Sequence, residues 1–527
     1  MNNFIILSSF VGFFNKHIKN RGDIIKLFKA VAILTIFSVI TRMLGFVFKI
    51  FLSRTLTTEM LGIYSIVVSI FMVFVTILAS GIPLAVSKTT IINKDKPSKA
   101  NGSVTSALII STIISIVIAL IILVCKKLFV GYFGNTNAYI LLLLMTPAII
   151  FTGIYSPFKG YLWGKEKFTE VSLVELIEQI IRLGCYFICF YLLQPNNILY
   201  PAGISLSVAC ILSTILGIIL FFKSKGRLTS PKSCFKPIFR SATPITCVRL
   251  ATSLMQPFMA FLLPIMLVKA GFTNEQALSQ LGIAMGMTLP FLSIPSTLIG
   301  SLAMAIVPNL TDLYNTKNYC ALKKQITYAI NFTLCCSFIA IPCFIALGEP
   351  LCQLIFDNIT AGTYLKHISW MIVPMGLSQI TTSMLNSLNL ESKTFRYYLY
   401  SCVVSILCVI ILPKYIGVYA LMYAIGLSML LISILNLITI NKTIKSNKTY
   451  LGIILKLVVI SIPCIYFTNW LYNLILFVFG NFVSIVISGG ISIIIFTIMM
   501  SVFNIVDITY LSAMYKTKVK TNKKCTT

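Results

Sequence analysis

Two basic residues, Arg42 and Lys49, lie within an apolar segment, residues 30–53, that is long enough to cross a membrane as one helix. At 100° per residue they share a narrow sector of that helix with four small or polar residues: Thr35, Ser38, Gly45 and Ser53. Arg42 lies roughly 18 Å along the helix, near the middle of a ~30 Å hydrocarbon layer. A charge at that depth costs at least ~2.5–3.5 kcal/mol, so it must face protein or water. The stripe predicts an anion site; the alternative is a structural role in which both bases snorkel or pair with an acid.

A second stripe of this kind occurs in residues 240–268. Its members are small or polar and recur at helical spacing: Ala242, Thr246, Arg249, Ser253, Gln256 and Ala260. Arginine suits phosphate because its planar guanidinium can bind two oxygens at once. We therefore expect a cationic cavity that binds a phosphate- or pyrophosphate-bearing substrate, with these candidate binding residues: Arg42, Lys49, Arg249, Gln256, Ser38 and Ser253.

Acidic residues are few, 13 in all, and nearly all of them lie in predicted loops. The exception is residues 171–193, where Glu178 and Arg182 are four apart and Glu175 lies one turn earlier. These three residues form either a structural ion pair or a site for a coupling ion, H⁺ or Na⁺. The sequence has no catalytic motif and no cluster with metal-ligand spacing, so we expect no enzyme activity, no metal and no cofactor.

Composition indicates a polytopic membrane protein. The 527 residues are 58% hydrophobic and 10% charged, whereas soluble proteins have about 25% charged residues. The net charge of +29 is spread over short loops, which indicates membrane topology and not nucleic-acid binding. Hydropathy predicts fourteen membrane helices at residues 30–53, 60–86, 102–124, 138–161, 171–193, 199–222, 240–268, 277–307, 322–347, 364–388, 394–413, 416–440, 451–472 and 480–504. With both termini cytoplasmic, 32 Lys and Arg fall in inside segments and 6 in outside loops, which supports this topology.

The predicted fold is an all-α integral membrane protein with two six-helix lobes and two appended helices. The sequence Leu-Gly-Ile recurs at Gly62 and Gly282, and Pro147 matches Pro374 at a similar shift. Two lobes of the same orientation are related by a pseudo-twofold axis along the membrane normal. The predicted parts are an interfacial segment 1–29, an N-lobe 30–222, a basic linker 223–239, a C-lobe 240–440, two helices in 441–504 and a basic tail 505–527.

Helix breakers cluster in the second, seventh and eighth predicted helices. The second helix is expected to end at Gly81-Ile82-Pro83, and proline within a helix favours a kink. We expect these residues to allow the gates of a two-lobed transporter to bend: Gly81, Pro83, Pro257, Pro290 and Pro295. The alternative is that the kinks are static and only fit the bundle.

The sequences TRMLGFVFKIFLSRTLTTEMLGIYS, from Thr41 to Ser65, and GIPLAVSK, from Gly81 to Lys88, carry a family resemblance. They resemble the polysaccharide transporter branch of the multidrug/oligosaccharidyl-lipid/polysaccharide (MOP) flippase superfamily, and its sporulation members in particular. The related lipid II flippases keep essential arginines on their first helix, and Arg42 matches one of them. Those flippases have another arginine six residues later. At that position this chain has Phe48, and its basic residue, Lys49, follows one place later.

The resemblance implies a multi-pass protein of the bacterial cell membrane that flips a lipid-linked, pyrophosphate-bearing cell-wall oligosaccharide for spore cortex peptidoglycan. Expected partners are this anionic substrate, membrane lipids and cell-wall synthesis enzymes. The last two helices are expected to help form a groove for the lipid tail. Two other functions remain open: a cation-coupled multidrug exporter, for which twelve helices and an acidic cavity are expected, and a non-transporting scaffold in envelope assembly.

Overall fold

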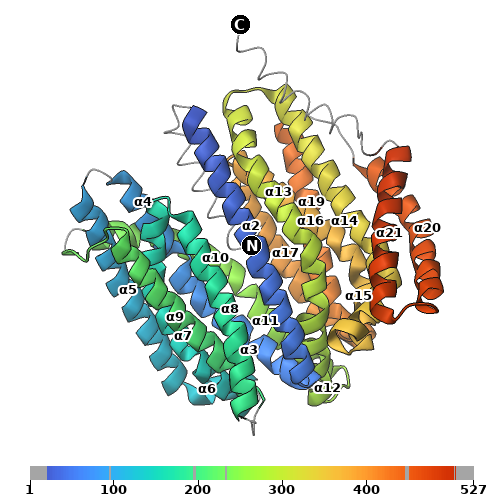
Figure 1. The fold of residues 1–527 in the computed structure, drawn as a ribbon, viewed down its shortest axis with the longest axis horizontal. Coiled ribbons are helices and arrows are strands. Elements are labelled where there is room, and N and C mark those ends of the chain that lie inside the picture. Colours follow the sequence, from blue (N-terminus) through green and yellow to red (C-terminus); the bar gives the residue numbers. More distant parts are fainter. Residues whose placement is uncertain are drawn as a thin grey trace. The chain divides into compact units, whose positions relative to one another are not determined.

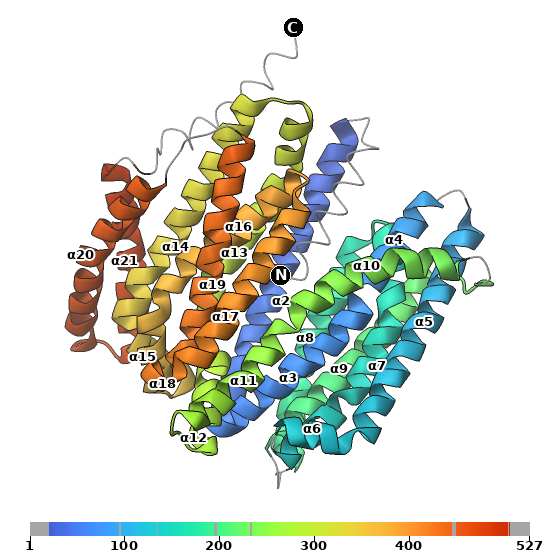
Figure 2. The ribbon, with the colours of Figure 1, turned by 180° about the vertical axis from the view of Figure 1, so that it is seen from behind.

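A computed structural model describes residues 21–93, 96–133, 135–193, 198–231, 234–444, 450–503 and 505. Every regular element in these ranges is a helix (Figure 1; Figure 2 shows the reverse side). Most of the predicted amino-terminal segment and of the carboxy-terminal tail lies outside the described residues. The expected all-α membrane fold is therefore confirmed for the part of the chain that is described.

The first half of the chain forms the following elements: α2 Arg21–Thr55, α3 Thr58–Ala79, α4 Gly81–Ile92, α5 Pro97–Val124, α6 Lys126–Phe133, α7 Thr136–Gly164, α8 Phe168–Leu193, α9 Tyr200–Lys223, α10 Phe235–Ser253, α11 Met255–Lys269, α12 Asn274–Gly282 and the π-helix η1 Ile283–Thr288. The second half forms α13 Leu289–Asn315, α14 Tyr319–Phe356, α15 Ile359–Ile368, the 3₁₀ turn η2 Ser369–Met371, α16 Ile372–Ser387, α17 Glu391–Ile411, α18 Pro413–Ile416, α19 Tyr419–Thr443, α20 Leu451–Leu476 and α21 Asn481–Val502.

Contacts group the chain into two compact units. Unit 1 comprises residues 1–290 and 395–428, and unit 2 comprises residues 291–394 and 429–527. In unit 1, α7 packs against α3, α4, α5 and α9, while α8 packs against α9 and α2. In unit 2, α14 packs against α15, α16, α20 and α21. These units group residues by contact, and the bounds of the two predicted lobes remain a prediction.

Twelve helical segments in the described residues are long and apolar enough to cross a membrane. The other two predicted helices correspond to α8 and to the segment from α15 to α16. The 26-residue helix α8 contains four charged residues, Glu170, Glu175, Glu178 and Arg182. The second segment is interrupted by η2, which leaves only 16 residues in α16. The chain is a multi-pass membrane protein, and the number of fourteen crossings remains a prediction.

The predicted kink residues lie next to real helix breaks. The expectation that the second helix ends at Gly81-Ile82-Pro83 is wrong, because α4 begins at Gly81, directly after Ser80, and continues to Ile92. Pro83 occupies the first turn of α4, where the missing N–H of proline leaves no bond unmade. Pro257 in α11 and Pro290 in α13 have the same position after a break, whereas Pro295 lies further inside α13.

Two matched glycines of the internal repeat meet between α3 and α12 in unit 1. A Cβ added to Gly62 would lie closer than 3.0 Å to the carbonyl group of Leu278, and one added to Gly282 would lie equally close to the backbone of Thr58 and Gly62. The Ser279 hydroxyl also donates to Thr58 Oγ1 at 2.7 Å. The two helices therefore approach each other backbone to backbone, which only residues without a side chain allow.

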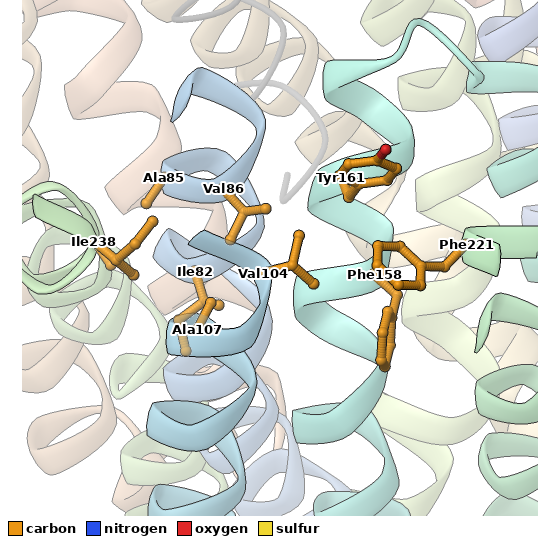
Figure 3. Close-up of a cluster of buried hydrophobic side chains, with 10 residues drawn as sticks. Ile82, Ala85, Val86, Val104, Ala107, Phe158, Tyr161, Phe221 and Ile238 are labelled. Atoms are coloured by element: carbon orange, nitrogen blue, oxygen red, sulfur yellow. The ribbon is translucent and has the colours of Figure 1, made fainter. Parts of the chain in front are cut away.

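A buried cluster fixes α4 and α10 in unit 1 (Figure 3). Ile82, Ala85 and Val86 of α4 pack with residues of α5, α7 and α9, and Ile238 of α10 lies next to them. At Gly81, an added Cβ would collide with the carbonyl oxygen of Ala242, so α4 and α10 are also in close backbone contact. These contacts position the basic residues at the end of α4 and the start of α10.

Candidate anion-binding site

The basic stripe of α2 lies within unit 1 and has no acidic partner among the described residues. Arg42 is exposed, and Ser38 and Lys49 are half-buried. The ion pairs found in the described residues join Lys159 to Glu175, Lys167 to Glu170 and Lys366 to Glu349, so none includes a residue of this stripe. An anion would therefore meet uncompensated positive charge along α2.

Aromatic contacts join α2 to α8 at Phe48 and Phe51, next to Lys49 in the sequence. The rings of Phe48 and Tyr186 meet edge to face with centroids 5.4 Å apart, and those of Phe51 and Phe187 do so at 4.5 Å. Thr55 and Tyr186 also share a hydrogen bond between their hydroxyls. This interface fixes the rotation of α2, because Phe48 is buried there while its neighbour Lys49 stays half-buried.

Arg182 of α8 joins the cations of α2. Its guanidinium carbon lies 4.2 Å from the centroid of the Phe48 ring, and Nη2 donates to the Tyr64 hydroxyl at 2.9 Å. Lys49 lies close enough for the charges of Lys49 and Arg182 to repel each other. Arg182 Nε is buried and has no hydrogen-bond partner among the residues that the structure describes. Glu178 of the same helix lies within electrostatic range of Arg182, but no carboxylate of the described residues forms an ion pair with Lys49 or Arg182. Two neighbouring like charges that no ion pair compensates indicate a place where an anion lowers the electrostatic energy.

The expected ion pair between Glu178 and Arg182 does not form in the described residues. Glu175 pairs with Lys159 of α7, and Lys159 also lies over the Trp163 ring, 4.9 Å from its centroid. The Ser213 hydroxyl of α9 lies within hydrogen-bonding reach of Glu178. Spacing of i, i+4 permits an ion pair but does not require one, because the tertiary neighbours Tyr64 and Phe48 hold Arg182 elsewhere.

The stripe of α10 contains the most deeply buried of the predicted binding residues. Arg249 is only 5% exposed, and its Nε and Nη2 have no hydrogen-bond partner within the described part of the chain. Ser253 is half-buried and its hydroxyl donates to the Arg249 carbonyl oxygen at 2.8 Å. Gln256 follows in α11 and is exposed. A buried guanidinium with unused donors is suited to a charged acceptor from outside the chain.

The structure brings the candidate residues together only in part. Both α2 and α10 pack against α3, but they do not form a helix pair with each other in the described residues. Lys49 and Arg182 thus form one group, which Arg42 extends by about two turns along α2. Arg249, Ser253 and Gln256 form another, and both groups belong to unit 1. The described residues contain no His, Cys, Asp and Glu group suited to a metal ion.

Sequence reasoning missed Arg182 as a member of the first group and Tyr64 as the hydrogen-bond partner of Arg182. Arg182 carried a signal, since it is a basic residue near the middle of the predicted helix 171–193. Its nearest acid along the helix, Glu178, suggested a different partner, and nothing in the sequence indicates that α8 packs against α2.

Comparisons with known proteins agree with this architecture. The family model for polysaccharide biosynthesis proteins matches residues 27–314. Stage V sporulation protein B of Bacillus subtilis (strain 168) is 23% identical over 435 residues, which cover 79% of this chain and 84% of that protein.

Two solved structures share the fold. The lipid II flippase MurJ, in an inward closed conformation, has a TM-score of 0.71 at 15% identity, covering 89% of this chain and 98% of the other. An inward-facing multidrug resistance MATE family transporter of the MOP superfamily has a TM-score of 0.63 at 16% identity, covering 77% and 94%.

These comparisons confirm the resemblance that residues 41–65 and 81–88 carry. The family and the structural neighbours are transporters and flippases and not enzymes. The matched region of the family model spans more than half of the 527 residues. The chain therefore belongs to the polysaccharide biosynthesis protein family.

Proposed function

We propose that this protein flips a lipid-linked, pyrophosphate-bearing cell-wall oligosaccharide across the bacterial cell membrane, with spore cortex peptidoglycan as its destination. The observation that carries the proposal is that three basic residues of unit 1 have no acidic partner among the described residues: Arg42, Lys49 and Arg249. Such charges are costly within a membrane and are retained where they serve a substrate. The names of the sporulation relative and of the flippase with the same fold support this choice of substrate.

In the proposed mechanism the pyrophosphate binds to the two basic groups while the polyprenyl chain stays in lipid. Arg42 and Lys49 of α2, supported by Arg182, offer charge-assisted hydrogen bonds to the phosphate oxygens. Arg249 offers its two unused donors, and Ser38, Ser253 and Gln256 add neutral ones. Alternating access then exposes the bound headgroup to each side in turn. Both termini are proposed to be cytoplasmic, and a coupling ion, H⁺ or Na⁺, to use Glu178 with Ser213.

Reconstitution tests the function directly. Purified protein in liposomes, with a fluorescent polyprenyl-pyrophosphate sugar in the membrane, is expected to move the label between leaflets faster than protein-free liposomes. A labelled phospholipid without the sugar serves as the control for leakage and general scrambling. Equal rates for both labels would contradict the proposal, and export of a cationic dye by the same liposomes would favour the multidrug exporter.

The close contact of α3 and α12 leads to a prediction about gating. We expect these helices to separate during transport, because breaks precede Pro83, Pro257 and Pro290 and provide bending points. A short reagent that cross-links cysteines placed at Glu59 and Leu278, in a variant without the 15 native cysteines, is expected to abolish transport.

The cross-linked protein is expected to keep its melting temperature and to regain transport when a cleavable reagent is reduced. Cysteines at Glu59 alone or Leu278 alone, treated with the same reagent, are the controls. Full transport with complete cross-linking would show that α3 and α12 do not separate.

A further inference from the structure

A basic pocket lies between α4 and α10, apart from the residues assigned to the substrate. It has a volume of about 770 Å³. Three of its lining residues are cations, Lys88 from α4 and Lys236 and Arg240 from α10, and Ser241 adds a hydroxyl. Arg249 lies nine residues after Arg240, which is roughly 13 Å along a helix, so the pocket is a second site and not an extension of the first.

The cations of this pocket are exposed, and no ion pair in the described residues compensates their charge. Lys236 and Arg240 are four residues apart, so they share one face of α10 and repel each other. Lys88 adds a third positive charge from α4, and no ion pair joins any of the three to a carboxylate in the described residues. The walls are fixed by the cluster of Figure 3, in which Ile238 lies between Lys236 and Arg240 in sequence and is only 1% exposed. The cluster therefore fixes the helices from which the three cations extend.

The lining also has an apolar part, which indicates the class of ligand. Leu84 and Ile245 lie beside the cations, so the pocket offers charge to one part of a ligand and hydrocarbon to another. The first turn of α10 adds the positive end of a helix dipole at Lys236. Basic pockets between membrane helices on the cytoplasmic side bind lipid headgroups. The predicted topology assigns residues 88–99 and 223–240 to that side.

We propose that this pocket binds the phosphate of an anionic lipid through Lys88, Lys236 and Arg240, with the adjoining hydrocarbon against Leu84 and Ile245. The same phosphate chemistry belongs to two sources: a bulk phospholipid such as phosphatidylglycerol, and a polyprenyl pyrophosphate on its way to α2. The inference concerns binding and does not depend on transport, so failure of the flippase assay leaves it intact.

The test compares two double variants of the full-length protein. Lys236→Gln/Arg240→Gln removes two pocket cations, and Lys223→Gln/Arg227→Gln removes two cations of the neighbouring linker that do not line the pocket. Each lowers the net charge of +29 by two. Binding of phosphatidylglycerol, of polyprenyl pyrophosphate and of inorganic phosphate is measured in the same detergent by native mass spectrometry, with the melting temperature as a check of folding.

We expect the pocket variant to lose affinity for at least one of the two lipids by about tenfold, while the linker variant keeps it. Loss for phosphatidylglycerol assigns the pocket to bulk lipid, and loss for polyprenyl pyrophosphate alone assigns it to the substrate. Lys88→Gln, from the opposite wall, is expected to weaken the same lipid. Equal losses in both double variants, no loss in either, or binding of inorganic phosphate without lipid would overturn the proposal.

Discussion

Arg42→Ala is expected to weaken binding of a polyprenyl-pyrophosphate sugar roughly ten- to a hundredfold. Losing a charge-assisted hydrogen bond in a site of low dielectric constant costs about 1.5–3 kcal/mol of binding free energy, which corresponds to that range. Arg42→Lys is expected to bind with intermediate affinity, because it keeps the charge and loses the planar fork. Binding is measured with the purified variants in one detergent, next to Arg227→Ala as a control that removes an exposed arginine outside the site.

The same variants separate substrate binding from a structural role. Arg42 is exposed and has no partner among the described residues, so its removal is expected to leave the melting temperature almost unchanged. Arg249→Met is expected to keep or raise the melting temperature, since it removes a buried charge with two unsatisfied nitrogens. Two results would show that Arg42 and Arg249 have a structural role. One is a large drop of the melting temperature with a proportional loss of folded protein, and the other is unaltered binding by Arg42→Ala.

Hydropathy and charge could predict the class of fold and the residues of the basic stripes, because both depend on the membrane as a solvent. A long apolar segment must become a helix in lipid, and a charge within it must face protein or water. The breaks near Pro83, Pro257 and Pro290 were predictable for the same local reason. That α4 continues beyond Gly81 was not, because proline is tolerated in the first turn of a new helix.

The contacts between distant helices could not be predicted. The spacing of Arg182 and Glu178 permits an ion pair, yet Phe48 and Tyr64 from other helices hold Arg182 beside Lys49. Lys88, Lys236 and Arg240 appeared only as topology signals, and they share a pocket because α4 packs against α10. Helix packing depends on how side chains fit across an interface, and this fit is not encoded in the period of a single helix.

The close approach of α3 and α12 at Gly62 and Gly282 leads to the second large expected effect. Both residues belong to unit 1, where each glycine faces the backbone of the other helix. An alanine at either position would place its Cβ closer than 3.0 Å to backbone atoms of the facing helix. Backbone cannot change rotamer to make room, so α3 and α12 would have to move apart.

Gly62→Ala and Gly282→Ala are each expected to destabilise the protein by about 1–3 kcal/mol or more, the usual cost of overpacking, and to lower the melting temperature accordingly. Gly45→Ala and Gly184→Ala are matched controls, because both glycines lie in helices and a Cβ there has no neighbour within 4 Å. In those controls alanine only removes the low helix propensity of glycine, so stability is expected to stay the same or rise by up to about 1 kcal/mol.

The double variant Gly62→Ala/Gly282→Ala is expected to cost less than the two single changes together, since one separation of α3 and α12 relieves both collisions. Thermal unfolding in a single detergent measures all five variants. A melting temperature for Gly62→Ala equal to that of Gly45→Ala would show that the backbones of α3 and α12 do not meet.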